Sequence, residues 1–199
     1  MDIIRTYKSN QNDNYNYFYE NINYNRLENL VDTLIKYKKY NIYLSGVGKS
    51  HNIAKHISDI LKSIGLKAFE FSLLNLVHGD FGCMKDNDLI ILFSKSGDTK
   101  EIIDILKIIK DNKINKILIS SNDNAKIKNY VDDKFIVPVK LEGDLMFNLI
   151  PTNSVINNLM YFNLVVNLYV KKNNLTLLEY KSNHPSGDIG FKTKRVKDF

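Results

Sequence analysis

The sequence is poor in cysteine, proline and long hydrophobic runs, and it has no tryptophan. Cys83 is the single cysteine, so no disulfide can form within the chain and a reducing compartment is expected. The longest apolar stretch, residues 150–170, is interrupted by Pro151 and several Asn, whereas a membrane span needs roughly 18 uninterrupted apolar residues. The N-terminal residues lack the apolar block of a secretory signal. We therefore expect a cytoplasmic protein without a membrane partner.

The excess of positive charge is modest and is not gathered in one place. The chain carries 28 Lys and Arg against 22 Asp and Glu, a formal charge of +6. Lysines are scattered over the predicted helices, and only residues 192–197 form a dense basic stretch. The 26 Asn, with abundant Ile and Lys, indicate AT-rich codons, which alone account for a basic composition. A nucleic-acid-binding protein concentrates its charge on one face or carries a readable motif, so no nucleic-acid partner is expected.

Short apolar runs alternate with helix-length segments along most of the chain. Residues 6–25 are polar and rich in Tyr and Asn without a clear period at first, and helical spacing runs from Tyr19 to Tyr40. Between the later runs a helical face recurs with apolar residues at i, i+3, i+4 and i+7, as at residues 102–109. The apolar runs predict five strands, at residues 41–44, 67–71, 88–93, 116–119 and 134–137.

Five strands separated by helices are typical of an open parallel sheet covered on both faces. The last helix, predicted over residues 152–172, is apolar nearly all round, so it is expected at the centre of the core or between subunits. The sequence therefore predicts one α/β domain over residues 41–199, preceded by an N-terminal helical arm over residues 1–40. Ligands of such sheets bind outside the carboxyl ends of the strands, so the segments after the strands form the candidate site.

The first strand leads into the sequence SGVGKS, residues 45–50, at the start of a helix. A P-loop would need a glycine five residues before Gly48, where Tyr43 stands, so ATP binding through this motif is excluded. Gly46 and Gly48 still let a ligand approach the backbone, and a helix N-terminus favours an anion. Lys49 lies where the helix dipole disfavours a cation, which indicates a bound anion or oxyanion; a solvated lysine is the alternative.

The third strand leads into a segment dense in hydroxyl groups, with the sequence SKSGDTKE at residues 94–101. Phosphate groups bind where short donors and backbone N–H groups converge on a helix N-terminus. The groups of this kind are Ser94, Ser96, Gly97 and Thr99. The alternative interpretation is ordinary helix capping, because Asp98 and Glu101 have the spacing of a capping box.

Three further stretches place ionisable side chains in loops or at a helix start. They are HGDFG at residues 78–82, Glu142 ahead of Pro151 and Thr152, and HPSGDIG at residues 184–190. A single loop histidine is more often a surface residue than a catalyst, and a single glutamate carries even less information. The evidence for function therefore depends on the whole set.

Five motifs, in this order, resemble those of the sugar isomerase (SIS) domain family, and within it the arabinose-5-phosphate isomerases. They are GVGKS (46–50), HGDFG (78–82), SKSGDTKE (94–101), Glu142 followed by LIPT (149–152), and HPSGDIG (184–190). The hydroxyl-rich loop alone indicates a phosphosugar-binding fold, and the HGD loop and the HP-x-G tail narrow the resemblance to the arabinose-5-phosphate branch. The resemblance covers residues 15–199.

The resemblance implies a five-stranded parallel sheet in the order 2-1-3-4-5. It implies cofactor-free interconversion of D-ribulose 5-phosphate and D-arabinose 5-phosphate, which feeds synthesis of the octulosonate sugar of lipopolysaccharide. It also implies a homotetramer whose active sites draw residues from neighbouring subunits. The four His and one Cys are scattered and have no metal-ligand spacing, so no metal is expected.

An aldose–ketose isomerase needs proton-transfer groups and a cation beside the enediolate oxygens. Carried over residue by residue, the family pattern assigns this chemistry to Lys49, His78, Glu101, Glu142 and His184. The lysine is expected to stabilise charge, the histidines to transfer protons, and the carboxylates to act as base or orienting group. Phosphate binding is expected from Ser94, Ser96 and Thr99, with help from Ser50 and Thr152 and with close backbone approach at Gly46, Gly48 and Gly97.

This chain departs from the family pattern at three positions, with His51 and Ser186 where glycine is usual and Asp98 where glutamate is usual. None of these changes removes a functional side chain carried over from the family. Many members continue into a pair of CBS domains, which this chain is expected to lack. The alternatives are a 3-hexulose-6-phosphate isomerase, a phosphosugar-sensing module without catalysis, and an inactive homologue.

Overall fold

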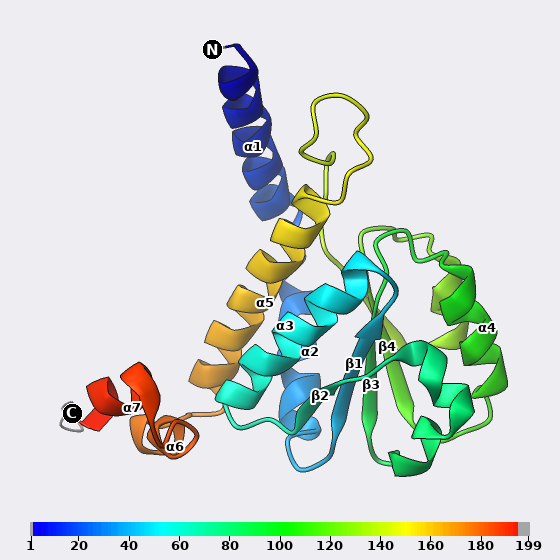
Figure 1. Ribbon diagram of the computed structural model, residues 1–199, viewed down its shortest axis with the longest axis vertical. Coiled ribbons are helices and arrows are strands. Elements are labelled where there is room, and N and C mark those ends of the chain that lie inside the picture. The colour runs from blue at the N-terminus through cyan, green and yellow to red at the C-terminus, as the bar shows by residue number, and fades with distance from the viewer. Residues whose placement is uncertain (1, 195–199) are drawn as a thin grey trace.

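The computed structural model describes residues 2–194, with side chains described through residue 191. Its centre is a sheet of five parallel strands in the order β2-β1-β3-β4-β5, which confirms the expected topology (Figure 1). The strands are β1 (Ile42–Gly46), β2 (Ala68–Glu70), β3 (Leu89–Phe93), β4 (Asn115–Ser120) and β5 (Asp133–Ile136). Gly46 pairs with Phe93 in the register, so β1 and β3 end at the same edge of the sheet.

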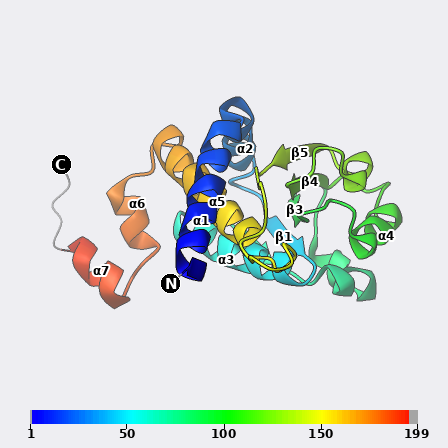
Figure 2. The ribbon, with the colours of Figure 1, turned by 90° about the horizontal axis from the view of Figure 1, so that it is seen from above.

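One face of the sheet is covered by three helices (Figure 2). They are α2 (Tyr24–Lys36), α3 (Lys49–Ser63) and α5 (Asn153–Lys172). Alternate strand residues, such as Leu44, Ile91 and Phe93, belong to the same buried cluster as these helices. The long helix predicted at residues 152–172 is thus confirmed as α5, and it packs within this layer.

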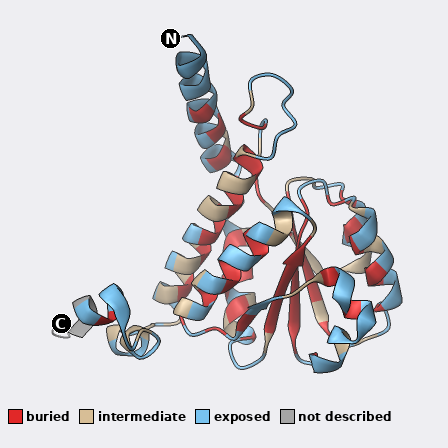
Figure 3. Ribbon diagram, in the orientation of Figure 1, coloured by how far each residue is buried: buried red, intermediate tan, exposed pale blue. Residues whose placement is uncertain are grey.

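The other face is covered by shorter elements. They are α4 (Lys100–Ile108) and the 3₁₀ helices η1 (Leu73–His78), η2 (Asp80–Cys83) and η3 (Lys126–Tyr130). The intervening strand residues, such as Tyr43, Ile90 and Leu92, pack into this second cluster. Because both faces are covered, the central strands are buried throughout and their sequences show no polar alternation (Figure 3).

Helix α1 (Asp2–Asn21) forms from the segment whose first part has no clear hydrophobic period. It docks on the start of α5 through buried amides, and near its end Phe18 is buried in the hydrophobic core. Gln11 Nε2 donates to Asn153 Oδ1 at 2.8 Å, and Asn14 and Asn157 exchange two hydrogen bonds of 2.8 and 3.2 Å. The remainder of α1 extends beyond the body of the molecule (Figure 1). By contrast α2, the second half of the predicted arm, packs on the sheet.

The C-terminal helices lie beyond the far end of α5, away from the carboxyl ends of the strands (Figures 1 and 2). They are α6 (Leu177–Ser182) and α7 (Gly187–Lys194). The dense basic stretch at residues 192–197 lies outside the described side chains. Among the helices that the structure describes, none combines the length and the apolar character that crossing a membrane requires.

Candidate functional site

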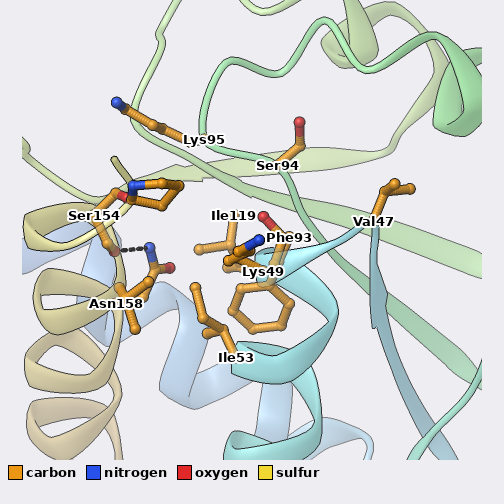
Figure 4. A pocket seen from close by; sticks show the side chains of 12 residues that line it. Val47, Lys49, Ile53, Phe93, Ser94, Lys95, Ile119, Ser154 and Asn158 are labelled. Atoms are coloured by element: carbon orange, nitrogen blue, oxygen red, sulfur yellow. Dashed lines mark hydrogen bonds between the residues drawn. The ribbon is translucent and has the colours of Figure 1, made fainter. Parts of the chain in front are cut away.

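A cavity of about 190 Å³ opens at the carboxyl ends of β1, β3 and β4, between the sheet and the start of α5. Three chain segments supply its polar side chains (Figure 4). They are Lys49 and Ser50 at the start of α3, Ser94 and Lys95 after β3, and Ser154 and Asn158 in the first turns of α5. The cavity therefore lies where open parallel sheets bind their ligands, as the sequence predicts.

Helices α3 and α5 begin at this cavity, and α4 begins after the loop that carries Ser94; the three N-termini differ in how they are capped. No side chain caps α3 at Gly48 or α4 at Thr99. In contrast, the N–H groups of Thr152 and Ser154 at the start of α5 donate to the Glu142 carboxylate, at 2.9 and 3.0 Å. Helix N-termini with free N–H groups carry partial positive charge, so the starts of α3 and α4 suit an anion.

The turn between β1 and α3 positions Lys49 as the first residue of its helix. At Gly46 a Cβ atom would lie 2.9 Å from the Phe93 carbonyl oxygen and 2.8 Å from the Ser50 carbonyl carbon. Packing within the chain itself thus requires a glycine here, independently of any ligand. Gly48 has φ +60°, a left-handed conformation that favours glycine, and its Cβ direction is open. The turn exposes the Lys49 side chain at the mouth of the cavity.

The loop after β3 holds its hydroxyl groups together before any ligand binds. Ser94 Oγ and Thr99 Oγ1 are 2.8 Å apart, and Ser94 Oγ also accepts a hydrogen bond of 3.1 Å from the Gly97 N–H. The Ser96 hydroxyl accepts from the Asp98 N–H at 3.2 Å. Gly97 has φ +67°, and a Cβ atom there would lie 2.0 Å from that of Ala125, so only glycine fits.

The capping box that competes with the phosphate interpretation does not form. The Asp98 carboxylate instead accepts a hydrogen bond of 2.8 Å from the Lys126 N–H, in the segment after β4. Glu101 is exposed on the first turn of α4 and is outside the lining of the cavity. The helix start is therefore open to another acceptor, as phosphate binding requires.

Glu142 is buried, with 4% of its surface exposed, and both of its carboxylate oxygens are engaged. Oε1 lies 2.6 Å from the Lys95 ammonium, while Oε2 accepts the two N–H groups that begin α5. Burial alone would raise the pKa of Glu142, but hydrogen bonds from Lys95, Ser154 and Thr152 outweigh it and hold the pKa below its usual value. The carboxylate is thus an ionised link between the phosphate loop and α5.

The structure does not bring every predicted residue to this cavity. The Thr152 hydroxyl, predicted to help bind phosphate, accepts a hydrogen bond of 2.6 Å from the Gly143 N–H. His78 is the exposed last residue of η1 and does not line the cavity.

His184 lies far from Lys49 within the chain. Its Nδ1 is 2.9 Å from the Tyr180 carbonyl oxygen, and the centroids of the His184 and Tyr180 rings are 4.4 Å apart. The neighbouring Asn183 amide donates to the carbonyl of Ser63, the last residue of α3, whereas Lys49 is the first. At 1.5 Å per residue, the 15 residues of α3 separate the two ends by about 20 Å. One chain therefore does not unite these two predicted catalytic groups.

Three polar residues that line the cavity, Lys95, Ser154 and Asn158, were not among the predicted site residues. Lys95 stands between the two serines of the phosphate loop, and this position was the only signal in the sequence. In the sequence, Asn158 differs from its surroundings only as a polar residue within a largely apolar predicted helix. In the described part of the chain, no three His, Cys, Asp or Glu side chains come together in a group that could hold a metal ion.

Comparisons with known proteins identify the family to which the chain is related. A family model, the SIS domain, matches residues 34–168. An uncharacterized protein of Chlamydia pneumoniae is 31% identical over 199 residues, which are 100% of this chain and 60% of that protein. The arabinose 5-phosphate isomerase KdsD of Francisella tularensis is 30% identical over 154 residues, 77% of this chain and 47% of that protein. A solved structure of an E. coli CFT073 protein in complex with arabinose 5-phosphate is 26% identical, with a TM-score of 0.82, and the match covers 92% of this chain and 98% of that one.

The chain spans about half the length of the curated relatives it matches. The SIS model covers more than half of the chain, and the five parallel strands have the order that the resemblance implies. The chain belongs to the SIS domain family and has the fold of its sugar-phosphate isomerases.

Proposed function

We propose that the protein is an aldose–ketose isomerase that interconverts D-ribulose 5-phosphate and D-arabinose 5-phosphate. The observation that carries the proposal is the cavity itself, which is lined by Lys49 at the uncapped start of α3 and by Ser94 and Lys95 of the hydroxyl-rich loop. Ser96, Gly97 and Thr99 lie outside this lining, but Thr99 at the uncapped start of α4 contacts Ser94. The names of two relatives support it, since one is an arabinose 5-phosphate isomerase and the other was solved in complex with arabinose 5-phosphate. The product would supply synthesis of the octulosonate sugar of lipopolysaccharide.

The phosphate group is assigned to the loop of residues 94–99. The Ser94 and Thr99 hydroxyls, which now bond to each other, would turn toward phosphate oxygens, with the Ser96 hydroxyl and the N–H groups at the start of α4. Ser50 lies across the cavity and would add a further donor. The reacting carbons would then lie toward Lys49 and α5.

The chemistry requires a proton to move between C1 and C2 and an enediolate to be stabilised. Lys49 supplies the cation. Glu142 is unsuited to remove the carbon proton, because a general base works best with a pKa near neutrality and the pKa of Glu142 is lowered. Its two engaged oxygens fit a positioning role instead. Proton transfer is therefore assigned to His78 and His184, with Glu101 as a further base or orienting group.

Assembly would bring the histidines to the cavity. Lys49 and His184 lie near opposite ends of α3 in one chain, so they can share a site only if His184 comes from another subunit. Helix α5 supports assembly, because several of its apolar side chains, among them Val155, Leu164 and Leu168, are only partly buried. We assign the protein a homotetrameric state with active sites shared between subunits.

The test is incubation of the purified protein with D-ribulose 5-phosphate, with arabinose 5-phosphate separated and quantified. Lys49→Ala provides the control for contaminating isomerases. The proposal expects turnover by the wild type and a loss of at least a hundredfold in the variant. Conversion of a 3-hexulose 6-phosphate instead would favour the alternative isomerase, and tight binding of phosphosugars without turnover would favour a sensing module.

A further inference from the structure

Asn158 lies in the second turn of α5 with its side chain against the cavity. Only 7% of the residue is exposed. Its amide oxygen, Oδ1, is buried and has no hydrogen-bond partner among the described residues. Figure 4 shows this oxygen on the side of the amide that faces Phe93 and Ile119. A polar acceptor thus points into the cavity, toward apolar side chains.

The orientation of the amide is set by its nitrogen. Asn158 Nδ2 donates a hydrogen bond of 2.7 Å to the Ser154 carbonyl oxygen, one turn earlier in α5. A carbonyl oxygen accepts and cannot donate, so rotating the amide by half a turn would set two acceptors against each other. The oxygen therefore faces the cavity and the nitrogen faces the helix.

A buried acceptor without a donor destabilises a fold, and such groups are few in native proteins. The cavity also has donors in its lining, such as Lys49 and Ser94, but no described residue donates to Oδ1, and Ile53, Phe93 and Ile119 of the same lining are apolar. A donor for Oδ1 is therefore expected from a molecule that enters the cavity. A phosphate dianion has only acceptor oxygens and would be repelled by Oδ1, whereas a hydroxyl group can donate to it.

We propose that Asn158 recognises the carbohydrate part of the ligand, with Oδ1 accepting a hydrogen bond from a hydroxyl of the sugar chain. This inference rests on the proposed function and extends it to specificity. The cavity then has two ends of different chemistry. Ser94 and the start of α4 bind the phosphate, and Asn158 on α5 binds a hydroxyl. Ligands with a phosphate but no hydroxyl chain gain nothing from Asn158.

The experiment compares two probes by isothermal titration calorimetry, inorganic phosphate and D-arabinose 5-phosphate, at matched ionic strength. The variant is Asn158→Leu, which keeps the approximate shape of the side chain and removes the acceptor. The matched control is Asn167→Leu, because Asn167 makes the same bond to the carbonyl oxygen four residues earlier, at 2.7 Å to Asn163, on an exposed part of α5. Asn158→Ala is measured in parallel in case leucine overfills the site.

We expect Asn158→Leu to bind D-arabinose 5-phosphate about fivefold to tenfold more weakly than the wild type, with phosphate affinity unchanged within twofold. Its melting temperature without ligand should equal or exceed that of the wild type, since an unpartnered acceptor is removed. Asn167→Leu should leave both affinities unchanged.

Three results would overturn the inference. Equal weakening of both probes would mean that Asn158 acts through the phosphate site, and no weakening of either would mean that water satisfies Oδ1. Turnover of D-ribulose 5-phosphate is measured separately. A wild-type protein that binds D-arabinose 5-phosphate without converting it contradicts the proposed reaction, and the binding comparison still decides the role of Asn158. A wild type that binds phosphate but not D-arabinose 5-phosphate overturns the inference.

Discussion

The Lys95 ammonium lies 2.6 Å from Oε1 of Glu142, and the other oxygen of the same carboxylate caps α5. One buried carboxylate therefore joins the phosphate loop after β3 to the helix that forms the opposite wall of the cavity. The Lys95 side chain is 47% exposed and the Glu142 side chain is fully buried. The carboxylate has therefore lost more hydration than the ammonium. This asymmetry determines how the pair responds to mutation and to pH.

Removing the cation should destabilise the protein. Lys95→Met leaves the Glu142 charge buried with only N–H donors, and we expect the free energy of unfolding at pH 7 to fall by about 2 kcal/mol. The control is Lys107→Met, which breaks the exposed ion pair of Lys107 with Asp104 and should change stability by less than about 0.5 kcal/mol. Urea denaturation followed by circular dichroism measures both. Equal effects of the two substitutions would contradict the role given to Glu142.

The same pair predicts a dependence of stability on pH. The folded pKa of Glu142 lies below its usual value of 4.5, so its ionised form contributes stability that is present above that value and is lost as the pH falls through the folded pKa. Without Lys95, only the hydrogen bonds from Ser154 and Thr152 oppose the effect of burial, so this contribution becomes smaller. The difference in melting temperature between wild type and Lys95→Met should therefore be largest near pH 7 and shrink below about pH 4. A difference that stays constant from pH 7 to pH 3 would be inconsistent with this account.

Loss of a loop hydroxyl should weaken phosphate binding. Ser94→Ala removes the group that bonds to Thr99 and to the Gly97 N–H, and we expect about tenfold weaker binding of D-arabinose 5-phosphate and of inorganic phosphate alike. Ser58→Ala is the control, because Ser58 is also buried but bonds to its own helix away from the cavity. A liganded structure with the phosphate bound only at Gly46–Gly48 would show that the phosphate site is misassigned.

Shared active sites predict that two inactive variants restore each other. His184→Ala and Lys49→Ala should each lose about 10²- to 10⁴-fold in rate, and mixed tetramers should regain part of the activity. Lys49→Ala mixed with Ser94→Ala should not recover, since both residues line one cavity of one chain. Failure of the first pair to recover, with subunit exchange shown by mass spectrometry, would place His184 in its own subunit's site or outside catalysis.

The proposed assembly predicts a single particle of four chains. Light scattering across micromolar concentrations should give four times the mass of one chain, because the partly buried apolar side chains of α5 need a partner surface. A monomer mass over this range would contradict the tetramer and, with it, the shared site.

Much of the sheet could be predicted from the sequence, because strands covered on both faces are continuous apolar runs and β3, for example, is buried from Leu89 to Phe93. A helical arm was expected over residues 1–40, but the docking of α1 could not be predicted, since its docking residues Gln11 and Asn14 are amides that contribute no hydrophobic period. Tertiary pairing, rather than local propensity, determines where this helix lies.

The candidate site was predictable where its residues follow the strands directly, as Lys49 and Ser94 do. It was not predictable where a contact joins distant segments. The partner of Lys95 is 47 residues away at Glu142, and nothing local to either residue indicates the pair. The positions of His78 and His184 depend on neighbouring subunits in the proposed assembly, so no property of a single chain reveals where they act.

The most direct test of the central claim is incubation of the wild-type protein with D-ribulose 5-phosphate in deuterium oxide, followed by NMR of the products. The account predicts D-arabinose 5-phosphate that carries deuterium at C2, because the enediolate is protonated at that carbon by a group that exchanges with solvent. Lys49→Ala should form this product at least a hundredfold more slowly. The absence of D-arabinose 5-phosphate above the level formed by Lys49→Ala would contradict the account.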